Sequence, residues 1–368
     1  MNGTQLSTGQ RLAVSPAADL MRAGVYRGAG KVVLESVPIP AISEDEVLVR
    51  VDACGICGTD VKKIHKGYVE PPQIFGHEIA GTIEEAGRAV RNWKYGQRVV
   101  CFHHVPCERC FFCERKFFSQ CAQYKKVGVT AGFQPNGGGF SEYVRVMNWV
   151  VQRGVIEIPS QVEFERAVFV EPVNTCWKAI RKARIEPSET VVVLGQGPIG
   201  LLLMMLARYV GASVLTTDPL LSRRQKSLQL GAEDSWDSSD AHVRGRVAAR
   251  TDGRGADAVL VTAPLGPLLQ QALDLTRPGG RVLLFAYNDP LIRAGFSGSA
   301  IGVEEKEILG SYSSDWDLRE EAARFVFAGI LPVDKLITHR FPLAEIGEAV
   351  ALAAAPSADS LKVIVKSR

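Results

Sequence analysis

The feature that most constrains the fold of this chain is a glycine loop directly after an apolar segment. Residues 190–194 read Thr-Val-Val-Val-Leu, and such a run of β-branched and apolar residues predicts a buried strand. An apolar segment over 198–209 predicts a helix that ends near Gly211. Between strand and helix lies the loop Gly195, Gln196, Gly197, Pro198, Ile199 and Gly200. This order of elements is typical of a doubly wound parallel sheet that binds a dinucleotide.

The glycine loop also suggests how a cofactor would bind. Gly197 would let the backbone approach a pyrophosphate, and Gly200 would let the helix pack closely on the strand. The positive end of the helix would face the phosphates. We therefore expect cofactor contacts at Gly195, Gly197, Pro198, Ile199 and Gly200.

The end of the next predicted strand indicates which cofactor is used. Asp218 lies there, and its carboxylate could accept hydrogen bonds from both ribose hydroxyls of NAD. The same charge would repel the 2′-phosphate of NADP, so NAD is favoured. The following predicted helix carries two cations that could instead tolerate this phosphate, although such residues are more often solvated: Arg223 and Arg224.

The length of 368 residues predicts more than one domain. Short strand patterns separated by glycine-containing loops predict an irregular β-barrel over 21–171, whereas strands alternating with helices predict a parallel sheet over 172–314. Residues 315–368 contain one helix pattern and one strand pattern, and could return to the first domain. Residues 1–20 are polar without the apolar core of a signal peptide, which predicts a flexible extension.

Charge and hydropathy exclude several classes of partner. The net charge is +3 and the cations are scattered, which gives no reason to expect binding to nucleic acid or to an acidic membrane. No segment reaches the roughly 18 consecutive apolar residues of a membrane span. We therefore expect a cytoplasmic protein whose partner is a small molecule.

Five of the eight cysteines fall between residues 101 and 121, a segment that we call the cysteine lobe. Four of them have the spacing of a metal site: Cys107, Cys110, Cys113 and Cys121. Four thiolates can surround one zinc ion and leave no position open, so such a site is structural. Charged neighbours argue against a cluster of buried apolar thiols, and the expected compartment argues against disulfides.

A second candidate metal site lies upstream of the cysteine lobe. Cys57 belongs to the segment Gly-Ile-Cys-Gly-Thr-Asp at 55–60, and His77 belongs to Gly-His-Glu at 76–78. Together with an acid they would form a mixed ligand set that leaves one zinc position open for a substrate. Beside a dinucleotide site, such a metal suggests hydride transfer from an alcohol that the metal polarises.

With these motifs, the chain resembles the zinc-dependent medium-chain alcohol dehydrogenase family, and within it the polyol (sorbitol-like) and threonine dehydrogenase branch. The resemblance extends over nearly all of 21–366 and rests also on the turn at 138–143 and on Glu171-Pro172. It implies a GroES-like β-barrel catalytic domain, a Rossmann domain of doubly wound α/β type, and a cleft between them. It also implies a homodimer or homotetramer.

The resemblance further implies roles for individual residues. The catalytic zinc ligands would be Cys57, His77 and Glu171, with Glu78 as an exchanging or water-mediated ligand. Counting the cysteine lobe, each chain would hold two zinc ions besides NAD. The resemblance also implies that the Asp60 carboxylate orients His77. The Thr59 hydroxyl would relay the substrate proton, and Thr175 would contact the underside of the nicotinamide.

Two more positions are informative. One differs from the family pattern, and the other bears on the substrate. Lys62 stands where relatives usually carry a relay histidine, so the final proton acceptor is either Lys62 or water. His103 aligns with a substrate-lining position that is aromatic and apolar in simple alcohol dehydrogenases. Together with His104 it predicts a polar pocket for a secondary alcohol of a polyol, sugar or cyclitol; the alternative is that either histidine only caps the lobe.

Three other functions compete with this interpretation. A simple alcohol or amino-alcohol (threonine-type) dehydrogenase of the same family would share every motif. A zinc-free quinone reductase of the same fold would lack both cysteine motifs. A non-catalytic NAD-binding scaffold protein would have no use for Cys57, His77 and Glu171 together, so we expect an enzyme.

Overall fold

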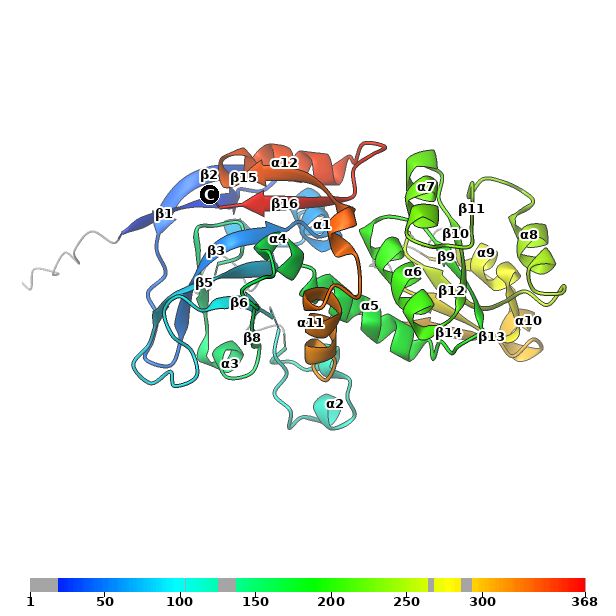
Figure 1. Cartoon of the computed structure of the whole chain (residues 1–368), viewed down its shortest axis with the longest axis horizontal. Helices are drawn as coiled ribbons and strands as arrows, with labels where there is room; N and C mark the ends of the chain where they lie inside the picture. Colours follow the sequence, from blue (N-terminus) through cyan, green and yellow to red (C-terminus); the bar gives the residue numbers. More distant parts are fainter. Residues whose placement is uncertain (1–18, 103, 125–136, 264–267, 286–292, 368) are drawn as a thin grey trace, which may run out of the picture.

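The computed structural model describes residues 19–102, 104–124, 137–263, 268–285 and 293–367. Within these residues the chain forms two parts that lie side by side, one built on antiparallel strands and one on a parallel sheet (Figure 1). The predicted flexible extension over 1–20 falls almost entirely outside the described residues. Leu20 already belongs to the first strand.

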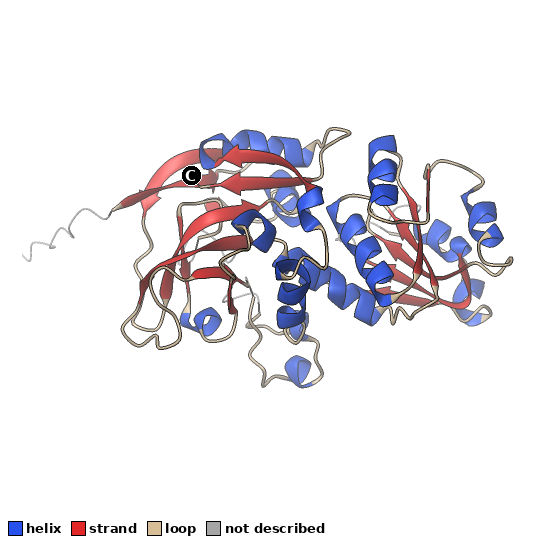
Figure 2. Ribbon diagram, in the orientation of Figure 1, coloured by secondary structure: helices blue, strands red, loops and turns tan. Residues whose placement is uncertain are grey.

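Antiparallel pairing dominates the first part, whose strands are drawn in red in Figure 2. Its main sheet has the order β15-β16-β3-β5-β6-β8, with β7 also paired to β3. These strands are β3 (Val47–Gly55), β5 (Glu78–Ala86), β6 (Arg98–Cys101), β7 (Tyr143–Val146), β8 (Val155–Glu157), β15 (Ile337–Pro342) and β16 (Lys362–Lys366). A smaller sheet is formed by β1 (Leu20–Tyr26), β2 (Val32–Pro38) and β4 (Gln73–Ile74).

Six parallel strands form the sheet of the second part, in the order β11-β10-β9-β12-β13-β14. Their bounds are β9 (Thr190–Leu194), β10 (Ser213–Thr217), β11 (Asp234–Trp236), β12 (Ala256–Val261), β13 (Thr276–Leu284) and β14 (Glu307–Gly310). The strand order reverses at β9, whose neighbours are β10 and β12. In a doubly wound sheet, ligands bind beside the carboxyl ends of the strands at this reversal.

Helices cover both faces of the parallel sheet, with α6 and α7 on one face and α8 and α9 on the other (Figure 1). The described helices are α1 (Gly58–Lys66), α2 (Phe111–Glu114), α3 (Asn148–Val151), α4 (Phe164–Ala167), α5 (Val170–Lys182), α6 (Pro198–Val210), α7 (Leu221–Gln229), α8 (Val243–Ala249), α9 (Leu268–Leu275), α10 (Ser299–Gly302), α11 (Arg319–Phe327) and α12 (Ile346–Ala354).

Two helices lie between the two parts, and a strand near the end of the chain returns to the first part. Helices α5 and α11 lie between the sheets, where the Trp177 ring contacts the Phe325 ring at 5.1 Å between centroids (Figure 1). Strand β16, near the end of the chain, pairs antiparallel with β3 in the first part. Residues from distant parts of the sequence therefore meet at the junction between the sheets.

The architecture confirms the predicted fold class, an antiparallel β structure joined to a doubly wound parallel sheet. Helix α5 begins at Val170 and ends at Lys182. Glu171 and Thr175 consequently lie on one helix. Across the described residues, no helix combines the length and the apolar character needed to cross a membrane.

Candidate functional site

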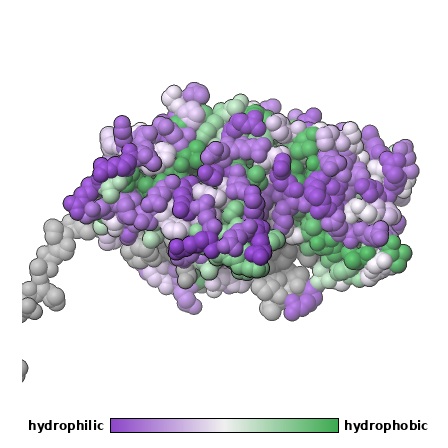
Figure 3. All heavy atoms as spheres, turned by 90° about the horizontal axis from the view of Figure 1, so that it is seen from below, coloured by the Kyte–Doolittle hydropathy of each residue, from purple (hydrophilic) through white to green (hydrophobic). Residues whose placement is uncertain are grey.

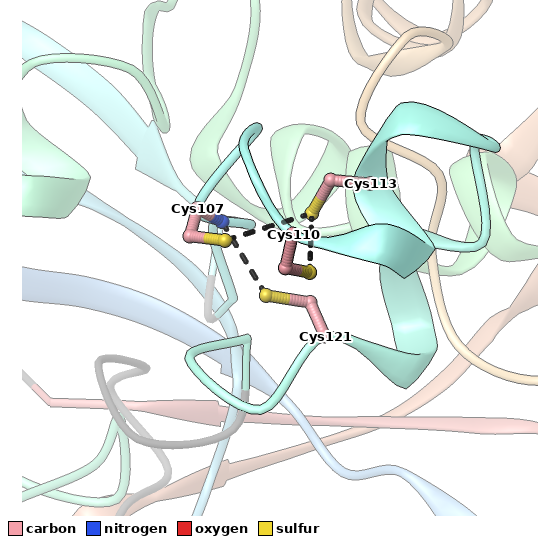
Figure 4. Close-up of side chains that lie close together, drawn as sticks. All are labelled: Cys107, Cys110, Cys113 and Cys121. Carbon is pink, nitrogen blue, oxygen red and sulfur yellow. Dashed lines mark hydrogen bonds between the residues drawn. The ribbon is translucent and has the colours of Figure 1, made fainter.

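The four cysteines of the predicted structural site converge in the cysteine lobe (Figure 4). All four sulfur atoms lie within 4.8 Å of one another. The Sγ atom of Cys113 is 3.5 Å from that of Cys110 and 3.9 Å from that of Cys107. Zinc–sulfur bonds of about 2.3 Å in a tetrahedron separate sulfurs by about 3.8 Å. The spacing therefore fits one zinc ion and is too long for disulfides.

The protonation of these thiols also bears on a metal. Burial raises the pKa of Cys113 to about 12, whereas a hydrogen bond from the backbone N–H of Cys113 is the main cause that lowers the pKa of Cys110 to about 7. At neutral pH Cys110 and Cys113 would therefore not ionise together by themselves. A divalent cation would supply the charge that keeps them deprotonated.

The second set of candidate ligands consists of Cys57, His77 and Glu78, whose ligand atoms lie within 4.8 Å of one another. Cys57 is the N-cap of α1, and its sulfur accepts a hydrogen bond from the Thr59 N–H at 3.5 Å. His77 directly precedes β5, and Glu78 is its first residue. The end of β3, the start of β5 and the N-terminus of α1 thus place a sulfur, an imidazole and a carboxylate together.

Asp60 holds this set in place, because its two carboxylate oxygens have different partners. One oxygen lies 3.1 Å from Nδ1 of His77, and the other accepts a hydrogen bond from the Cys57 N–H at 3.1 Å. Burial favours the neutral imidazole, but the charges of Asp60 and Cys57 raise the pKa of His77 overall. With Nδ1 bound to Asp60, Nε2 is the atom left to bind a metal.

Glu171 does not join this set of three, although the resemblance implied that it is a zinc ligand. Burial raises the pKa of its carboxyl to about 7, and the nearby charge of Glu78 adds to the shift. The phenol of Tyr124 lies close enough for the charge of Glu171 to raise its pKa further, although burial is the main cause. Glu171 therefore lies beside the set, in a site that disfavours its charged form.

Lys362 lies at the same site, although no motif of the sequence predicts it there. Its ammonium group forms a salt bridge with Glu78 and donates a hydrogen bond to the Ile56 carbonyl at 3.2 Å. Both side chains of the ion pair are buried. This cation reaches the site only because β16 pairs with β3.

The glycine loop has the tight geometry that its sequence predicted. Gly195 has a φ of +95°, which favours glycine. A Cβ atom on Gly200 would lie 1.9 Å from the Gly195 carbonyl oxygen, so only glycine fits. Gly197 is the N-cap of α6, with Pro198 as its first residue, and the open helix end faces the carboxyl end of β9.

Asp218 is buried beside the glycine loop at the end of β10. Its carboxylate oxygens accept hydrogen bonds from the backbone N–H groups of Gln196, at 2.7 Å, and Leu220, at 2.8 Å. These two bonds fix the carboxylate and leave further acceptor lone pairs.

The two arginines of α7 are half-buried rather than fully solvated. Arg224 pairs with Asp237 at 2.9 Å, and it also donates to the Asp218 carbonyl. Arg223 contributes to the wall of the cleft next to the glycine loop.

A single cleft connects the metal-ligand set with the glycine loop. It has a volume of about 1050 Å³ and is open to solvent. Cys57, Glu78 and Lys362 line one end, and the glycine loop with Asp218 and Arg223 lines the other. A dinucleotide bound to the loop would therefore extend toward the candidate metal ligands.

The remaining predicted site residues that the structure describes differ in exposure. Thr59 and Lys62 are half-buried on the first turns of α1. The Thr175 hydroxyl is buried and donates to the Pro172 carbonyl at 2.9 Å; Pro172 lines the cleft, whereas Thr175 does not. His103 lies outside the described residues. His104 stacks on Tyr124, with 4.6 Å between ring centroids.

A doubly wound sheet that faces a buried metal-ligand set across one cleft defines the class of nicotinamide-dependent dehydrogenases that use a metal. Comparison with known proteins agrees with this class. Residues 43–160 match the model of the alcohol dehydrogenase GroES-like domain, and residues 198–328 match that of the zinc-binding dehydrogenases.

Relatives match the chain over nearly its whole length. It is 30% identical to sorbitol dehydrogenase of Bombyx mori, covering 93% of this chain and 97% of the relative. It is 31% identical to D-arabinitol dehydrogenase 1 of Uromyces fabae, covering 89% and 92%. A solved zinc-binding dehydrogenase from Sinorhizobium meliloti 1021, bound to NADP, superposes with a TM-score of 0.85 at 29% identity, covering 95% and 99%. The chain therefore belongs to the zinc-dependent alcohol dehydrogenase family and is an oxidoreductase.

Proposed function

We propose that this enzyme transfers a hydride between NAD and a secondary alcohol of a polyol or related sugar derivative, with zinc at the metal-ligand set. The observation that carries the proposal is the single cleft lined both by Cys57 and Glu78 and by the glycine loop. Hydride transfer requires the nicotinamide and the reacting carbon to meet, and this cleft gives them a shared space.

The described residues are suited to hold two zinc ions. The cysteine lobe would hold a structural ion, whereas Cys57, His77 and Glu78 would hold a catalytic ion, with Glu171 as a further ligand that approaches when metal is present. A zinc ion there supplies a Lewis acid that polarises the substrate oxygen. Asp60 keeps the imidazole in the tautomer that can bind the metal, and Lys362 balances the charge of Glu78.

Removal of the substrate proton is assigned to α1. The Thr59 hydroxyl would accept the proton, and the amine of Lys62 or water would take it to solvent. Burial lowers the pKa of Lys62, so its amine becomes neutral, and able to accept a proton, at a lower pH than the amine of a solvated lysine. A change of Lys62 to methionine should then slow the reaction at low pH more than at high pH, where hydroxide can replace the base.

The substrate and cofactor classes are supported by the relatives and by Asp218. Two relatives are named as dehydrogenases of sorbitol and of D-arabinitol, both of which are polyols. The fixed carboxylate of Asp218 favours NAD, whereas Arg223 in the same cleft would tolerate a 2′-phosphate. One structural relative is bound to NADP, so the two cofactors should be compared directly.

The test combines metal analysis with a substrate screen. Purified protein should contain two zinc ions per chain and should reduce NAD when supplied with a polyol, followed by absorbance of the reduced cofactor. Substitution of Cys57 by serine should abolish the activity and leave the zinc of the cysteine lobe in place. Protein that carries both ions and binds NAD, yet oxidises no alcohol and reduces no ketone, would refute the proposal.

Assembly and location are also part of the proposal. Figure 3 shows apolar surface at the end of the molecule that carries the parallel sheet. Exposed apolar side chains precede the edge strand β14 in the sequence, namely Phe296, Ile301 and Val303. Within the described residues β14 is an edge strand, and such an edge next to apolar surface suits a second copy of the chain, which supports a homodimer or homotetramer. The cytoplasm is the location that we propose.

A further inference from the structure

The segment between β14 and α11 is bonded to both parts of the molecule. It comprises residues 311–317, and we call it the strap. Much of it is buried: Ser314 is 3% exposed and Trp316 is 8% exposed. Ser313 has a φ of +59°, a left-handed conformation that residues other than glycine rarely adopt. A buried segment in such a conformation persists only where its neighbours fix it.

Side chains of helix α5 hold the backbone of the strap. The buried amide of Asn174 donates to the Asp315 carbonyl at 3.0 Å and accepts from the Asp315 N–H at 2.6 Å. The ammonium group of Lys178 donates to the carbonyls of Tyr312 and Ser314 at 3.0 and 3.3 Å. The strap is therefore held to α5 as well as to the parallel sheet from which it continues.

The first part of the molecule holds the same strap through Tyr124, which lies three residues after the cysteine lobe. The Tyr124 phenol donates to the Ser314 carbonyl at 3.2 Å, and it lies 3.0 and 2.9 Å from the hydroxyls of Ser313 and Ser314. A phenol has one proton and two lone pairs, so it can donate to the carbonyl and accept from both hydroxyls. All three bonds can therefore form together.

Two contacts of the cysteine lobe itself add less to this attachment. The ammonium group of Lys116 pairs with Asp317 at 2.8 Å, but both side chains are exposed, and such pairs contribute little. The Trp316 indole donates to the Glu108 carboxylate at 3.1 Å, and the Glu108 side chain is also exposed. The bonds of Tyr124 are buried and shielded from water, so they are the stronger attachment.

The strap and Tyr124 are close to the proposed catalytic site. Burial is the main cause that raises the pKa of the Tyr124 phenol, and the nearby charge of Glu171 adds to it. Glu171 and Asn174 are three residues apart on α5, which corresponds to about 4.5 Å along the helix axis. The sheet that precedes the strap carries the glycine loop at its β9 strand. A shift of the strap relative to Tyr124 would therefore move the glycine loop relative to the metal-ligand set.

We propose that Tyr124 is a positioning residue for hydride transfer: its hydroxyl, bonded to the strap, holds the parallel sheet in the orientation that presents the cofactor to the metal-ligand set. The inference rests on the proposed function, since it concerns the geometry of that reaction. Tyr124 is not in the wall of the cleft, so it acts only through the strap. The cofactor and the alcohol are bound by different parts of the molecule, and a misplacement of about 1 Å can slow such a reaction about 100-fold.

The experiment uses conservative variants of the full-length, zinc-loaded protein. Tyr124→Phe removes the hydroxyl and keeps the ring, which stacks on His104 with 4.6 Å between centroids. Ser314→Ala removes a hydroxyl at the other end of the same contact and keeps the backbone of the strap. Tyr26→Phe is the matched control, because Tyr26 is equally buried, at 1% exposed, and packs on the Phe75 ring in the first part. Bound zinc, Tm and the affinity for NADH are measured for each variant.

In single turnovers with saturating NAD and a secondary alcohol, Tyr124→Phe should transfer hydride about tenfold more slowly than the wild type. The deuterium isotope effect on kcat should rise, because hydride transfer then limits the rate. The zinc content and the Kd for NADH should stay unchanged, since the metal-ligand set and the glycine loop are intact. Ser314→Ala should slow the transfer about threefold, and the double variant should be no slower than Tyr124→Phe, because both changes remove one contact.

Hydrogen exchange separates this inference from the proposed function. The backbone amides of the strap should exchange about tenfold faster in Tyr124→Phe than in the wild type, and at the wild-type rate in Tyr26→Phe. If Tyr124→Phe does not fold, Ser314→Ala carries the test with the same outcomes.

Three results would each overturn the inference and leave the dehydrogenase function standing. They are a wild-type rate of hydride transfer in Tyr124→Phe, an equal loss of rate in Tyr26→Phe, and unchanged exchange of the strap in Tyr124→Phe. A wild type that oxidises no alcohol and reduces no ketone would count against the proposed function instead. The exchange of the strap would still decide whether Tyr124 holds it.

Discussion

Substitution of Asp60 by asparagine tests the proposed catalytic metal site most directly. The carboxylate is 1% exposed and accepts two hydrogen bonds, from His77 Nδ1 and from the Cys57 N–H, both at 3.1 Å. An amide has only one oxygen, so it can accept only one of them. If the oxygen faces Cys57, the NH₂ group donates to Nδ1, and the imidazole proton moves to Nε2, the atom needed for the metal.

The magnitude follows from these two alternatives. Loss of the correct tautomer should weaken zinc binding about 10- to 100-fold, which corresponds to about 1.4 to 2.8 kcal/mol. If the amide is turned the other way, its NH₂ group meets the Cys57 N–H, and α1 loses its cap at a cost of about 0.5 to 2 kcal/mol. Either orientation weakens the site, and the helix fold should survive.

The assay counts zinc per chain after dialysis against chelators of increasing strength. The wild type should retain two ions under conditions in which Asp60→Asn retains one, because the cysteine lobe shares no ligand with Asp60 and acts as an internal reference. Asp52→Asn is the matched control, since Asp52 accepts from the Thr82 hydroxyl at 2.8 Å on the neighbouring strand. If Asp60→Asn holds both ions as tightly as the wild type, the proposed role of Asp60 is wrong.

Three further perturbations probe other parts of the molecule. Gly200→Ala would place a methyl carbon 1.9 Å from the Gly195 carbonyl oxygen, so fluorescence titration should show at least about tenfold weaker NADH binding; an unchanged Kd would contradict this. Cys113→Ser should reduce bound zinc from two ions to one and lower Tm, and retention of both ions would speak against the cysteine site. Because burial lowers the pKa of Lys178 to about 8 from 10.5, the folded state loses this proton first as pH rises. The wild type should therefore gain up to about 3 kcal/mol of unfolding free energy over Lys178→Met between pH 8 and 10.5, and a difference independent of pH in denaturant titrations would refute the shift.

The elements that the sequence predicted best are those whose residues are apolar on both faces. The strand predicted at 190–194 occurs with those bounds, and the helix predicted over 198–209 ends one residue later, at Val210. The strand and the helix after it are specified locally, because a glycine of positive φ follows each of them, Gly195 and Gly211. Here local preference and tertiary packing agree.

Other elements could not be predicted, because distant contacts decide them. Strand β11 (Asp234–Trp236) has only three residues, two of them polar, and its sole strand partner among the described residues is β10. Lys362 opens a strand whose next three residues are apolar, and its own charge would have suggested solvent. Only the pairing of β16 with β3 brings it to Glu78, some 280 residues earlier in the chain. The motifs thus pointed to three side chains that lie together, Cys57, His77 and Glu78, but not to the cation that pairs with Glu78.

The location of that cation has a consequence for how the protein matures. A ribosome extends the chain from its amino end, and domains generally fold in that order. Glu78 is therefore made long before Lys362, so a nascent chain that had folded its first strands would carry a buried acid without its lysine partner until β16 emerged. A chain that lacked β16 would keep Cys57, His77 and Glu78 but would leave this buried acid without its counter-charge.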